Sequence, residues 1–218
     1  MSRPHVMVYG CGKMARAFAL GLKKANPQLR FSCWTPSGEK ARALALELGG
    51  TWVQDLTLLS KDLTTVILGF KPQGLSAAGP EVQKHFAPGT LFVSLLAAVS
   101  LQTLSECFPG HPLVRVMPNL AVETNQGVVL WNSVGTSQSQ HQLWREALSS
   151  LGMAAELSEE HIDLYTMHSG SAPAFLYQWS RDAGVFAENN GGDARLAVQI
   201  FAQALRGALN SELRFEEL

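Results

Sequence analysis

The chain has 218 residues, of which 46% are hydrophobic and 16% charged, and its formal net charge at pH 7 is −1. This length suits one domain or two small ones with a well-formed core. The near-zero charge gives no support for a nucleic-acid partner or a membrane surface, and the sequence predicts neither a membrane span nor a signal peptide.

A short apolar run, Val6–Tyr9, is followed by a glycine-rich turn at residues 10–15. The turn has the spacing G-x-G-x-x-A of dinucleotide-binding βαβ units. Gly10 permits the tight turn, Gly12 lets a pyrophosphate approach the backbone, and Ala15 keeps helix and strand close. The amides and the positive end of the helix dipole then face the anion. The residues predicted to bind the dinucleotide here are Gly10, Gly12, Lys13, Met14 and Ala15.

The three cysteines, Cys11, Cys33 and Cys107, lack metal-ligand spacing. We therefore expect no metal site and a reducing, cytoplasmic setting. Cys11 is interpreted as a small filler at a variable position of the glycine motif rather than as a redox switch.

Strand-like and helix-like patterns alternate through the first two-thirds of the chain. The other expected strands are Phe31–Trp34, Val66–Gly69, Leu91–Leu95, Leu113–Met117 and Val128–Trp131. The expected helices are Met14–Ala25, Glu39–Leu48, Gly79–His85, Leu101–Cys107 and His141–Leu151. Strands that are apolar on both faces and alternate with helices indicate an α/β fold with a parallel, doubly wound sheet of the Rossmann type.

The pattern changes to helices alone in the last part of the chain. Ser158 suits a helix start, Pro173 suits the first turn of the next helix, and a third helix is expected from Asp193. We therefore predict a dinucleotide-binding domain over residues 1–156 and a small all-helical domain over residues 157–218.

The loop after the second expected strand contains no carboxylate directly behind the strand, where NAD-binding proteins place an acid for the adenosine ribose. An acid would repel a 2′-phosphate, whereas Thr35, Ser37 and Lys40 can donate hydrogen bonds or charge to one. We predict these three residues as cofactor ligands and favour NADP over NAD. The alternative is an ordinary strand–helix loop in which Ser37 caps the helix.

Three further loops are expected at the same edge of the sheet, beyond the carboxyl ends of strands, where open α/β sheets bind ligands. Lys71 is either a catalytic lysine or an exposed or helix-capping one held by a rigid Lys-Pro turn. Asn119 either orients a substrate or the nicotinamide carboxamide, or closes its turn through its own side chain. The residues predicted to contact the cofactor are Lys71, Pro72, Ala97 and Asn119.

A turn of small residues, Ser169–Ala172, lies between two expected helices. It is expected to present free amides and two hydroxyls at a helix N-terminus, an arrangement that suits a small carboxylate ligand. The predicted substrate-binding residues are Ser169, Gly170, Ser171 and Ala172. As structure alone, the segment is a helix–helix connection with capping serines.

Together these motifs resemble pyrroline-5-carboxylate reductase, the last enzyme of proline biosynthesis. Six motifs of the family are matched, wholly or in most positions. They are G-x-G-x-M-A at residues 10–15, V-K-P-Q at 71–73, R-x-M-P-N at 115–119, S-G-S-G-P-A-Y at 169–175, A-G-V at 183–185 and Q-x-x-x-G-A at 203–208. The likeness runs in order from residue 5 to about residue 209. The resemblance implies a Rossmann domain, a helical second domain and an NADPH-dependent reduction.

The chain also departs from the family pattern. The departures are Ala172 for glycine, Phe175 for tyrosine, His168 for an aliphatic residue, Leu120-Ala121 for Thr-Pro, and Leu96 and Ala98 for smaller residues near the nicotinamide. Family members typically continue into a Ser-Pro-Gly-Gly-Thr-Thr segment and a last helix, and we expect this chain to be a shortened member. The cofactor part is therefore expected to follow the family more closely than the substrate part.

The resemblance implies that NADPH delivers hydride to the C=N carbon of 1-pyrroline-5-carboxylate, which gives proline. The amides and hydroxyls of Ser169–Ala172 would bind the carboxylate, and Ser171 or a bound water is the suggested proton donor. His168 is a further candidate because an imidazole titrates near neutrality, although a histidine at a helix end is more often a cap or a packed side chain.

Two other functions fit the sequence. The chain could reduce a different imine or a 2-oxo acid, or it could be a non-catalytic relative that binds NADP. Its partners are expected to be a small imine carboxylate and a second copy of the chain, because the family dimerises through its C-terminal helices. The helix from Asp193 has an apolar face, and we expect a homodimer in which Ile200 and Leu205 face the partner.

Overall fold

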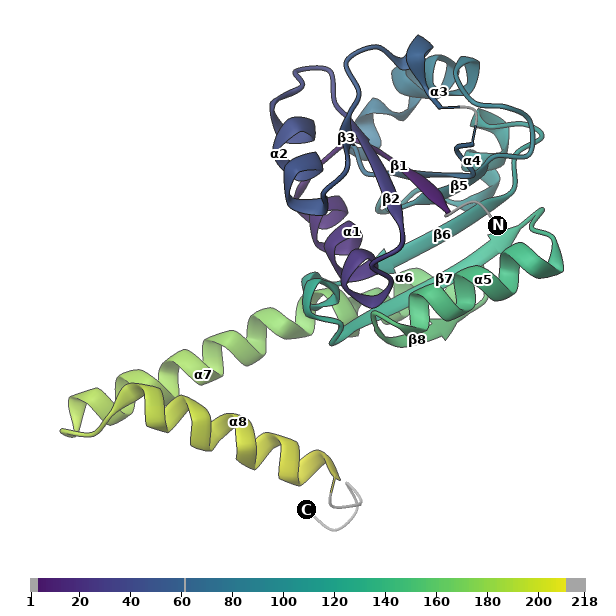
Figure 1. The fold of residues 1–218 in the computed structure, drawn as a ribbon. Helices are drawn as coiled ribbons and strands as arrows, with labels where there is room; N and C mark the ends of the chain where they lie inside the picture. Colours follow the sequence, from purple (N-terminus) through teal and green to yellow (C-terminus); the bar gives the residue numbers. More distant parts are fainter. Residues whose placement is uncertain (1–3, 61, 211–218) are drawn as a thin grey trace. The chain divides into compact units, whose positions relative to one another are not determined.

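The computed structural model describes residues 4–60 and 62–210. The chain divides into two compact units, Met1–Ser169 and Gly170–Leu218. Within the described residues, the first unit contains one eight-stranded sheet with its helices and the second contains the helices α7 and α8 (Figure 1).

The strands lie in the order β3-β2-β1-β4-β5-β6-β7-β8. Their bounds are β1 His5–Tyr9, β2 Arg30–Trp34, β3 Thr51–Trp52, β4 Thr65–Leu68, β5 Leu91–Ser94, β6 Leu113–Pro118, β7 Gly127–Val134 and β8 Gly152–Glu156. The helices are α1 Lys13–Ala25, α2 Glu39–Leu48, α3 Leu75–Lys84, α4 Leu101–Cys107, α5 Gln138–Ser149, α6 Glu159–Thr166, α7 Ala172–Asn189 and α8 Ala194–Asn210. The short helical segments are the 3₁₀ helices η1 Leu56–Leu58, η2 Pro72–Gly74 and η3 Leu120–Thr124, and the π-helical segment η4 Met167–Ser171.

The doubly wound α/β prediction is confirmed, but the sheet is not parallel throughout. Strands β3, β2, β1, β4, β5 and β6, in their order across the sheet, are parallel to one another. Strand β7 is antiparallel to β6, and β8 is parallel to β7. The connection from β6 to β7 comprises residues 119–126. A parallel crossover needs about a dozen residues or more, so this short link returns the chain antiparallel.

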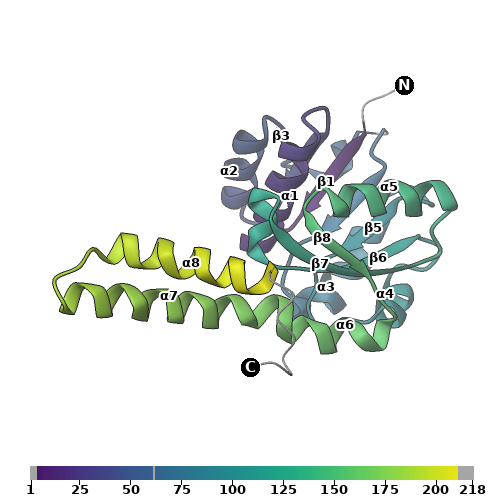
Figure 2. The ribbon, with the colours of Figure 1, turned by 90° about the horizontal axis from the view of Figure 1, so that it is seen from below.

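Helices cover both faces of the sheet, which explains why its strands are apolar on both sides. Val6 and Val8 of β1 pack into a core with α1, α2 and α5, whereas Met7 and Tyr9 pack into a second core with α3 and α4. Figure 2 shows these two layers of helices on opposite sides of the strands.

Several element bounds differ from the sequence-based expectation. Strands β3 and β8 were not predicted, because β3 is very short and β8, with the sequence GMAAE, is poor in β-branched and aromatic residues. Helix α3 begins at Leu75 rather than Gly79, and Pro80, which is typical of a first turn, lies inside it. Helix α5 begins before His141, at Gln138, after a capping box at Ser137.

The boundary expected near residue 156 differs from the division after Ser169. Helix α6 belongs to the first unit, since Ile162 is fully buried and Glu159 and Asp163 form ion pairs with Arg115 of β6. The change of pattern near residue 156 therefore marks the end of the last strand and not the end of the unit.

In the second unit, α7 and α8 form a helical hairpin. Gly191 has φ of 77° at the reversal, and the Asp193 carboxylate accepts a hydrogen bond from the Leu196 amide at 2.7 Å. The helix start expected at Asp193 is thus confirmed. Gly184 is buried at the contact, where a Cβ atom would lie 3.4 Å from Val198 Cγ2. In the part of the chain that the structure describes, we find no helix long and apolar enough to cross a membrane.

Candidate functional site

The glycine turn leaves β1 at the point where the strand order reverses, between β1 and β4. In open α/β sheets, ligands bind beyond the carboxyl ends of the strands at this switch point. Gly10 has φ of 95°, which glycine adopts without steric cost, and its amide donates to the Trp34 carbonyl of β2 at 2.9 Å. The turn is therefore fixed to the neighbouring strand.

The turn also packs tightly against the segment that leaves β4. A Cβ atom on Gly10 would lie 2.5 Å from the Phe70 nitrogen, and one on Gly69 would lie 2.3 Å from the Gly10 oxygen and 2.4 Å from Ala15 Cβ. Gly10, Ala15 and Gly69 must therefore all be small for the turn to pack against the end of β4. The close approach expected at Ala15 is made to Gly69, which the sequence pattern predicts only as the last residue of a strand.

Gly12 differs from Gly10 because no contact among the described residues requires a glycine there. Its φ of −72° suits any residue, and the nearest atom to a Cβ on Gly12 would be the Gly69 oxygen, at 3.4 Å. Gly12 is the N-cap of α1 and makes no side-chain cap hydrogen bond, so the first-turn amides lack that partner. A ligand that must meet bare backbone would explain the missing side chain.

A cavity of about 260 Å³ adjoins the turn between α1 and α2. Its lining residues are Cys11, Gly12, Lys13, Arg16, Lys40, Ala43, Leu44 and Glu47. Arg16, which lies one position beyond the glycine motif, donates to Glu47 at 2.5 Å and to Glu123 at 3.0 Å, and these hydrogen bonds raise its pKa. The exposed side chains of Lys13 and Lys40 add two further cations. The lining contains three cations and one carboxylate, which suits a phosphate ligand.

The loop after β2 offers two hydroxyl groups. The Thr35 Oγ1 atom is buried and has no hydrogen-bond partner within the described residues. The Ser37 side chain is exposed, and α2 begins after Gly38, which has φ of 74° and no side-chain cap. The alternative interpretation, in which Ser37 caps α2, is therefore wrong. A buried hydroxyl without a partner is costly and suggests a ligand atom or a water.

An aromatic cluster lies on the face of β1 that packs against α3 and α4. The Tyr9 ring stacks on Trp34 with centroids 4.4 Å apart and meets Phe70 edge-on at 5.8 Å. Burial, with a smaller contribution from the Glu81 carboxylate, raises the pKa of Tyr9 to about 12. Its hydroxyl group is therefore neutral at physiological pH.

The cysteine at the glycine turn lies inside the core. Cys11 and Cys33 are both free and buried in the same apolar cluster. The Cys11 thiol donates weakly to the Val8 and Trp34 carbonyls, at 3.8 and 3.7 Å. Its contact with the Cys33 thiol lowers the pKa of Cys11 and raises that of Cys33. These contacts fit the interpretation of Cys11 as a small filler.

The loops after β4 and β5 reach the same edge of the sheet as the glycine turn, because these strands are parallel to β1. Lys71 is exposed and precedes Pro72, the first residue of η2. Ala97 is exposed, and Ala98 has φ of 57°, which is uncommon for a residue with a side chain. The structure thus places Lys71, Pro72 and Ala97 at the predicted edge.

Asn119 uses both polar atoms of its side chain within the protein. Its Nδ2 donates to the Ser169 carbonyl at 3.1 Å, and its Oδ1 accepts from the Val128 amide at 3.2 Å. The side chain therefore closes its own turn, as the structural alternative held, and also holds Ser169. Contact of Asn119 with the cofactor stays a prediction.

The turn of small residues is not the open helix–helix loop that was expected. Residues 167–171 form the π-helical segment η4, which joins α6 directly to α7. Ser169 is buried and donates to the Thr166 carbonyl at 3.5 Å, whereas Ser171 is exposed and makes no cap hydrogen bond to α7. The expectation of capping serines was therefore wrong. π-Helical turns occur frequently at functional sites.

The chain is similar to proteins of one enzyme family. A pyrroline-5-carboxylate reductase from Pseudomonas aeruginosa is 30% identical over 227 aligned positions, which cover 100% of this chain and 83% of the relative. The chain belongs to the pyrroline-5-carboxylate reductase family. A reductase of the same name from Staphylococcus epidermidis is 28% identical over 178 positions, and the aligned part spans 65% of its length. Residues 5–98 match the family described as NADP oxidoreductase coenzyme F420-dependent.

Solved structures of the family have the same fold. The 1-pyrroline-5-carboxylate reductase of Streptococcus pyogenes superposes with a TM-score of 0.81 and 27% identity, covering 98% of this chain and 82% of that chain. The pyrroline carboxylate reductase of Plasmodium falciparum, solved with NADP bound, gives a TM-score of 0.82 at 18% identity, covering 100% and 83%. At the latter identity the likeness supports the fold alone.

Proposed function

We propose that the chain binds NADPH and uses it to reduce the C=N bond of 1-pyrroline-5-carboxylate, which gives proline. The observation that supports this most directly is Gly12, a glycine that the protein's own packing does not require, at the switch point of the sheet. Membership of the family supplies the reaction class, since the relatives of about 30% identity are named pyrroline-5-carboxylate reductases.

The residues present fit a phosphorylated dinucleotide. The unpartnered Thr35 hydroxyl and the exposed Ser37 and Lys40 side chains lie on the loop and helix that follow β2. They would hold the 2′-phosphate and ribose, and the amides that begin α1 would hold the pyrophosphate. Lys71, Pro72 and Ala97 are proposed to line the remainder. NADPH, when bound, supplies the hydride.

The substrate carboxylate is assigned to the segment Ser169–Ala172. The exposed Ser171 hydroxyl would donate to the carboxylate or, directly or through a water, pass a proton to the ring nitrogen. Because the protonated imine accepts hydride readily, the protein need not provide a strong acid. Its main task is to hold the reacting carbons at about 3–3.5 Å and to exclude water, which can lower the barrier by several kcal/mol.

The proposal includes a homodimer and a cytoplasmic setting. Phe175, Tyr177 and Phe186 of α7 and Ile200 of α8 expose most of their side-chain surface, which a second copy of the hairpin could cover. All three cysteines are free, which suits a reducing compartment.

NADPH oxidation in the presence of 1-pyrroline-5-carboxylate tests the proposal. We expect the loss of NADPH absorbance to depend on both reactants and proline to accumulate in equal amount. Turnover only with another cyclic imine or with a 2-oxo acid and an amine would reassign the substrate. NADPH binding without turnover on any imine would instead indicate a non-catalytic relative. The Gly12→Val variant, which we expect to lose affinity for the cofactor, serves as the control.

A further inference from the structure

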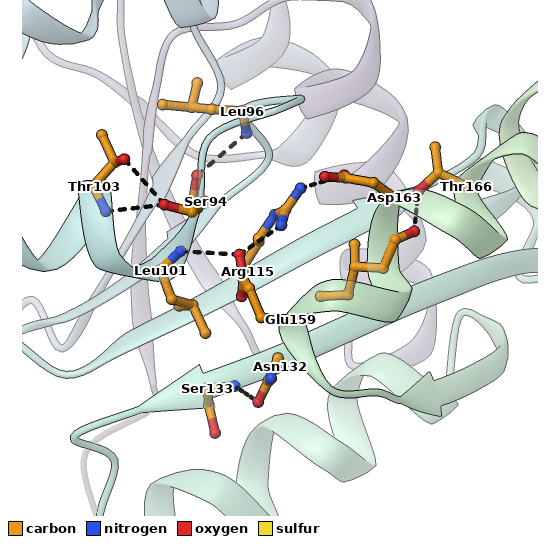
Figure 3. A network of polar contacts seen from close by, with 12 residues as sticks. Ser94, Leu96, Leu101, Thr103, Arg115, Asn132, Ser133, Glu159, Asp163 and Thr166 are labelled. Atoms are coloured by element: carbon orange, nitrogen blue, oxygen red, sulfur yellow. Dashed lines mark hydrogen bonds and ion pairs between the residues drawn. The ribbon is translucent and has the colours of Figure 1, made fainter.

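Two residues hold the segment from α6 to η4: Arg115 of β6 and Asn119, which directly follows β6. Arg115 is only 2% exposed, and its two terminal nitrogens each donate at 2.6 Å, one to Glu159 and the other to Asp163 (Figure 3). Because these carboxylates are four residues apart on α6, they lie on one face of the helix. One guanidinium therefore fixes both the position and the rotation of α6 on the sheet.

Glu159 extends this connection to a third element. The oxygen that accepts from Arg115, Oε1, also accepts from the Leu101 amide at 3.1 Å. Leu101 is the first residue of α4 and ends the loop from β5 that contains Ala97, a predicted cofactor contact. A single carboxylate oxygen thus joins the β5–α4 loop, β6 and α6.

Asn119 holds the other end of the segment. It follows β6 directly, and its side chain bridges the Ser169 carbonyl and the Val128 amide of β7. Ser169 is itself 7% exposed. The helix that leads into η4 is thus tied to Arg115 of β6, and the backbone of η4 is tied to Asn119, the residue directly after this strand.

Stability alone explains this arrangement poorly. The Arg115 guanidinium is buried, but the Glu159 and Asp163 side chains are 34% and 65% exposed, and ion pairs with a solvent-exposed partner usually contribute little to stability. Arg115 Nε and Glu159 Oε2 are buried without a hydrogen-bond partner in the described parts of the chain. The network therefore leaves polar atoms without hydrogen bonds, although it fixes both the position and the orientation of β6, α6 and the β5–α4 loop.

We propose that Arg115 and Asn119 are positioning residues for the substrate turn. They act through Glu159 and Ser169, and they set the backbone of residues 167–171 in the geometry that receives the substrate carboxylate. This inference rests on the proposed function, which assigns the carboxylate to that segment.

The Asn119→Asp variant tests the inference most sharply. Aspartate keeps the oxygen that accepts from the Val128 amide but lacks the donor to the Ser169 carbonyl and places a charged acceptor against it. The matched control is Asn26→Asp at the C-terminal end of α1, an exposed residue whose side-chain oxygen accepts a local hydrogen bond from the Gln28 amide at 3.1 Å. Both changes add one negative charge without changing side-chain size.

We expect Asn119→Asp to raise the KM for 1-pyrroline-5-carboxylate on the order of tenfold, the effect of losing one directed hydrogen bond with repulsion added. The dissociation constant for NADPH should stay within about twofold, since the lost bond is made to Ser169 and not to the cofactor. Asn26→Asp should change neither constant. Weakened NADPH binding with an unchanged KM would overturn the inference and place Asn119 on the cofactor.

Hydrogen exchange of the full chain provides a readout that does not depend on activity. Peptides covering residues 165–175 should exchange faster in Asn119→Asp than in the wild type or the Asn26→Asp control, and unchanged exchange would overturn the inference. Glu159→Gln, which keeps an acceptor for Leu101 but removes the charge facing Arg115, should give a smaller change of the same kind. If the wild type does not turn over 1-pyrroline-5-carboxylate, the proposed function fails, while the exchange rates still decide whether β6 positions the turn.

Discussion

The methyl group of Ala15 occupies the space that a side chain on Gly69 would need, because a Cβ atom built on Gly69 would lie only 2.4 Å from Ala15 Cβ. The same Cβ would lie 2.3 Å from the Gly10 carbonyl oxygen. The first turn of α1, the end of β1 and the end of β4 therefore meet through backbone and one methyl group. This contact fixes the floor of the proposed cofactor site.

Gly69→Ala should lower the free energy of unfolding by about 1–3 kcal/mol, the usual cost of overpacking a tight interior contact. Urea unfolding followed by tryptophan fluorescence measures the change. Gly74→Ala is the matched control, since a Cβ atom there would lie 3.5 Å from Phe70 Cδ2 and the φ of Gly74 is −83°. Equal stability of the two variants would contradict the assigned role of Gly69.

The sequence predicted the β1–turn–α1 unit because all of its signals are local. Gly10, Gly12 and Ala15 lie within six consecutive positions, and their spacing alone predicts the structural role of each. Their packing partner Gly69 is far away in the chain. A single glycine at the end of a strand has too many explanations to be singled out without the fold.

The network around Arg115 shows the same limit for the substrate turn. Arg115 and Asn119 were found as parts of a motif, but their partners Glu159 and Ser169 follow 44 and 50 positions later. No periodic pattern links such positions. The π-helical geometry of residues 167–171 was likewise not predictable, because the run of small residues is equally typical of an open turn.

Gly12→Val should weaken NADPH binding by at least about 100-fold and leave the protein folded, since the side chain would stand where a pyrophosphate meets backbone. The backbone at Gly12, with φ of −72° and ψ of 175°, is one that valine adopts readily. A fluorescence titration measures the affinity, and circular dichroism checks the fold. Wild-type affinity in this variant would remove the assignment of the dinucleotide site.

Ser37→Glu should reverse the preference for NADPH over NADH. A carboxylate on this loop would repel the 2′-phosphate and accept hydrogen bonds from the free ribose of NADH, with a change in relative affinity of about tenfold or more. The two dissociation constants are compared with those of Ser139→Glu, which adds the same charge on α5. If the wild type already binds NADH more tightly, the interpretation of the β2–α2 loop is wrong.

Tyr9 should make stability fall between pH 10 and 12. Its pKa rises from 10.0 to about 12 on folding, so the unfolded chain loses this proton first and the contribution of the neutral phenol disappears as pH increases through that range. In the Tyr9→Phe variant the free energy of unfolding should fall less steeply over this pH range, by about 1 kcal/mol or more per pH unit. Parallel slopes for wild type and variant would show that Tyr9 titrates normally.

The protein should form a homodimer through α7 and α8. Ile200 leaves 60% of its surface exposed, and large apolar side chains on both helices are exposed as well. Two helices alone cannot bury both of their apolar faces, and a second copy would cover them. We expect light scattering at micromolar concentration to give twice the mass of 23.6 kDa for the chain.

Ile200→Asp should convert this dimer to a monomer, because the interface would then bury an unpaired carboxylate. Leu46→Asp is the matched control, since Leu46 on α2 is 85% exposed and lies outside the proposed interface. Only the change at Ile200 should shift the mass, and it should also destabilise the hairpin in a concentration-dependent way. A wild-type monomer at these concentrations, with α7 and α8 stably helical, would refute the dimer and favour a family member that works or binds its cofactor as a single chain.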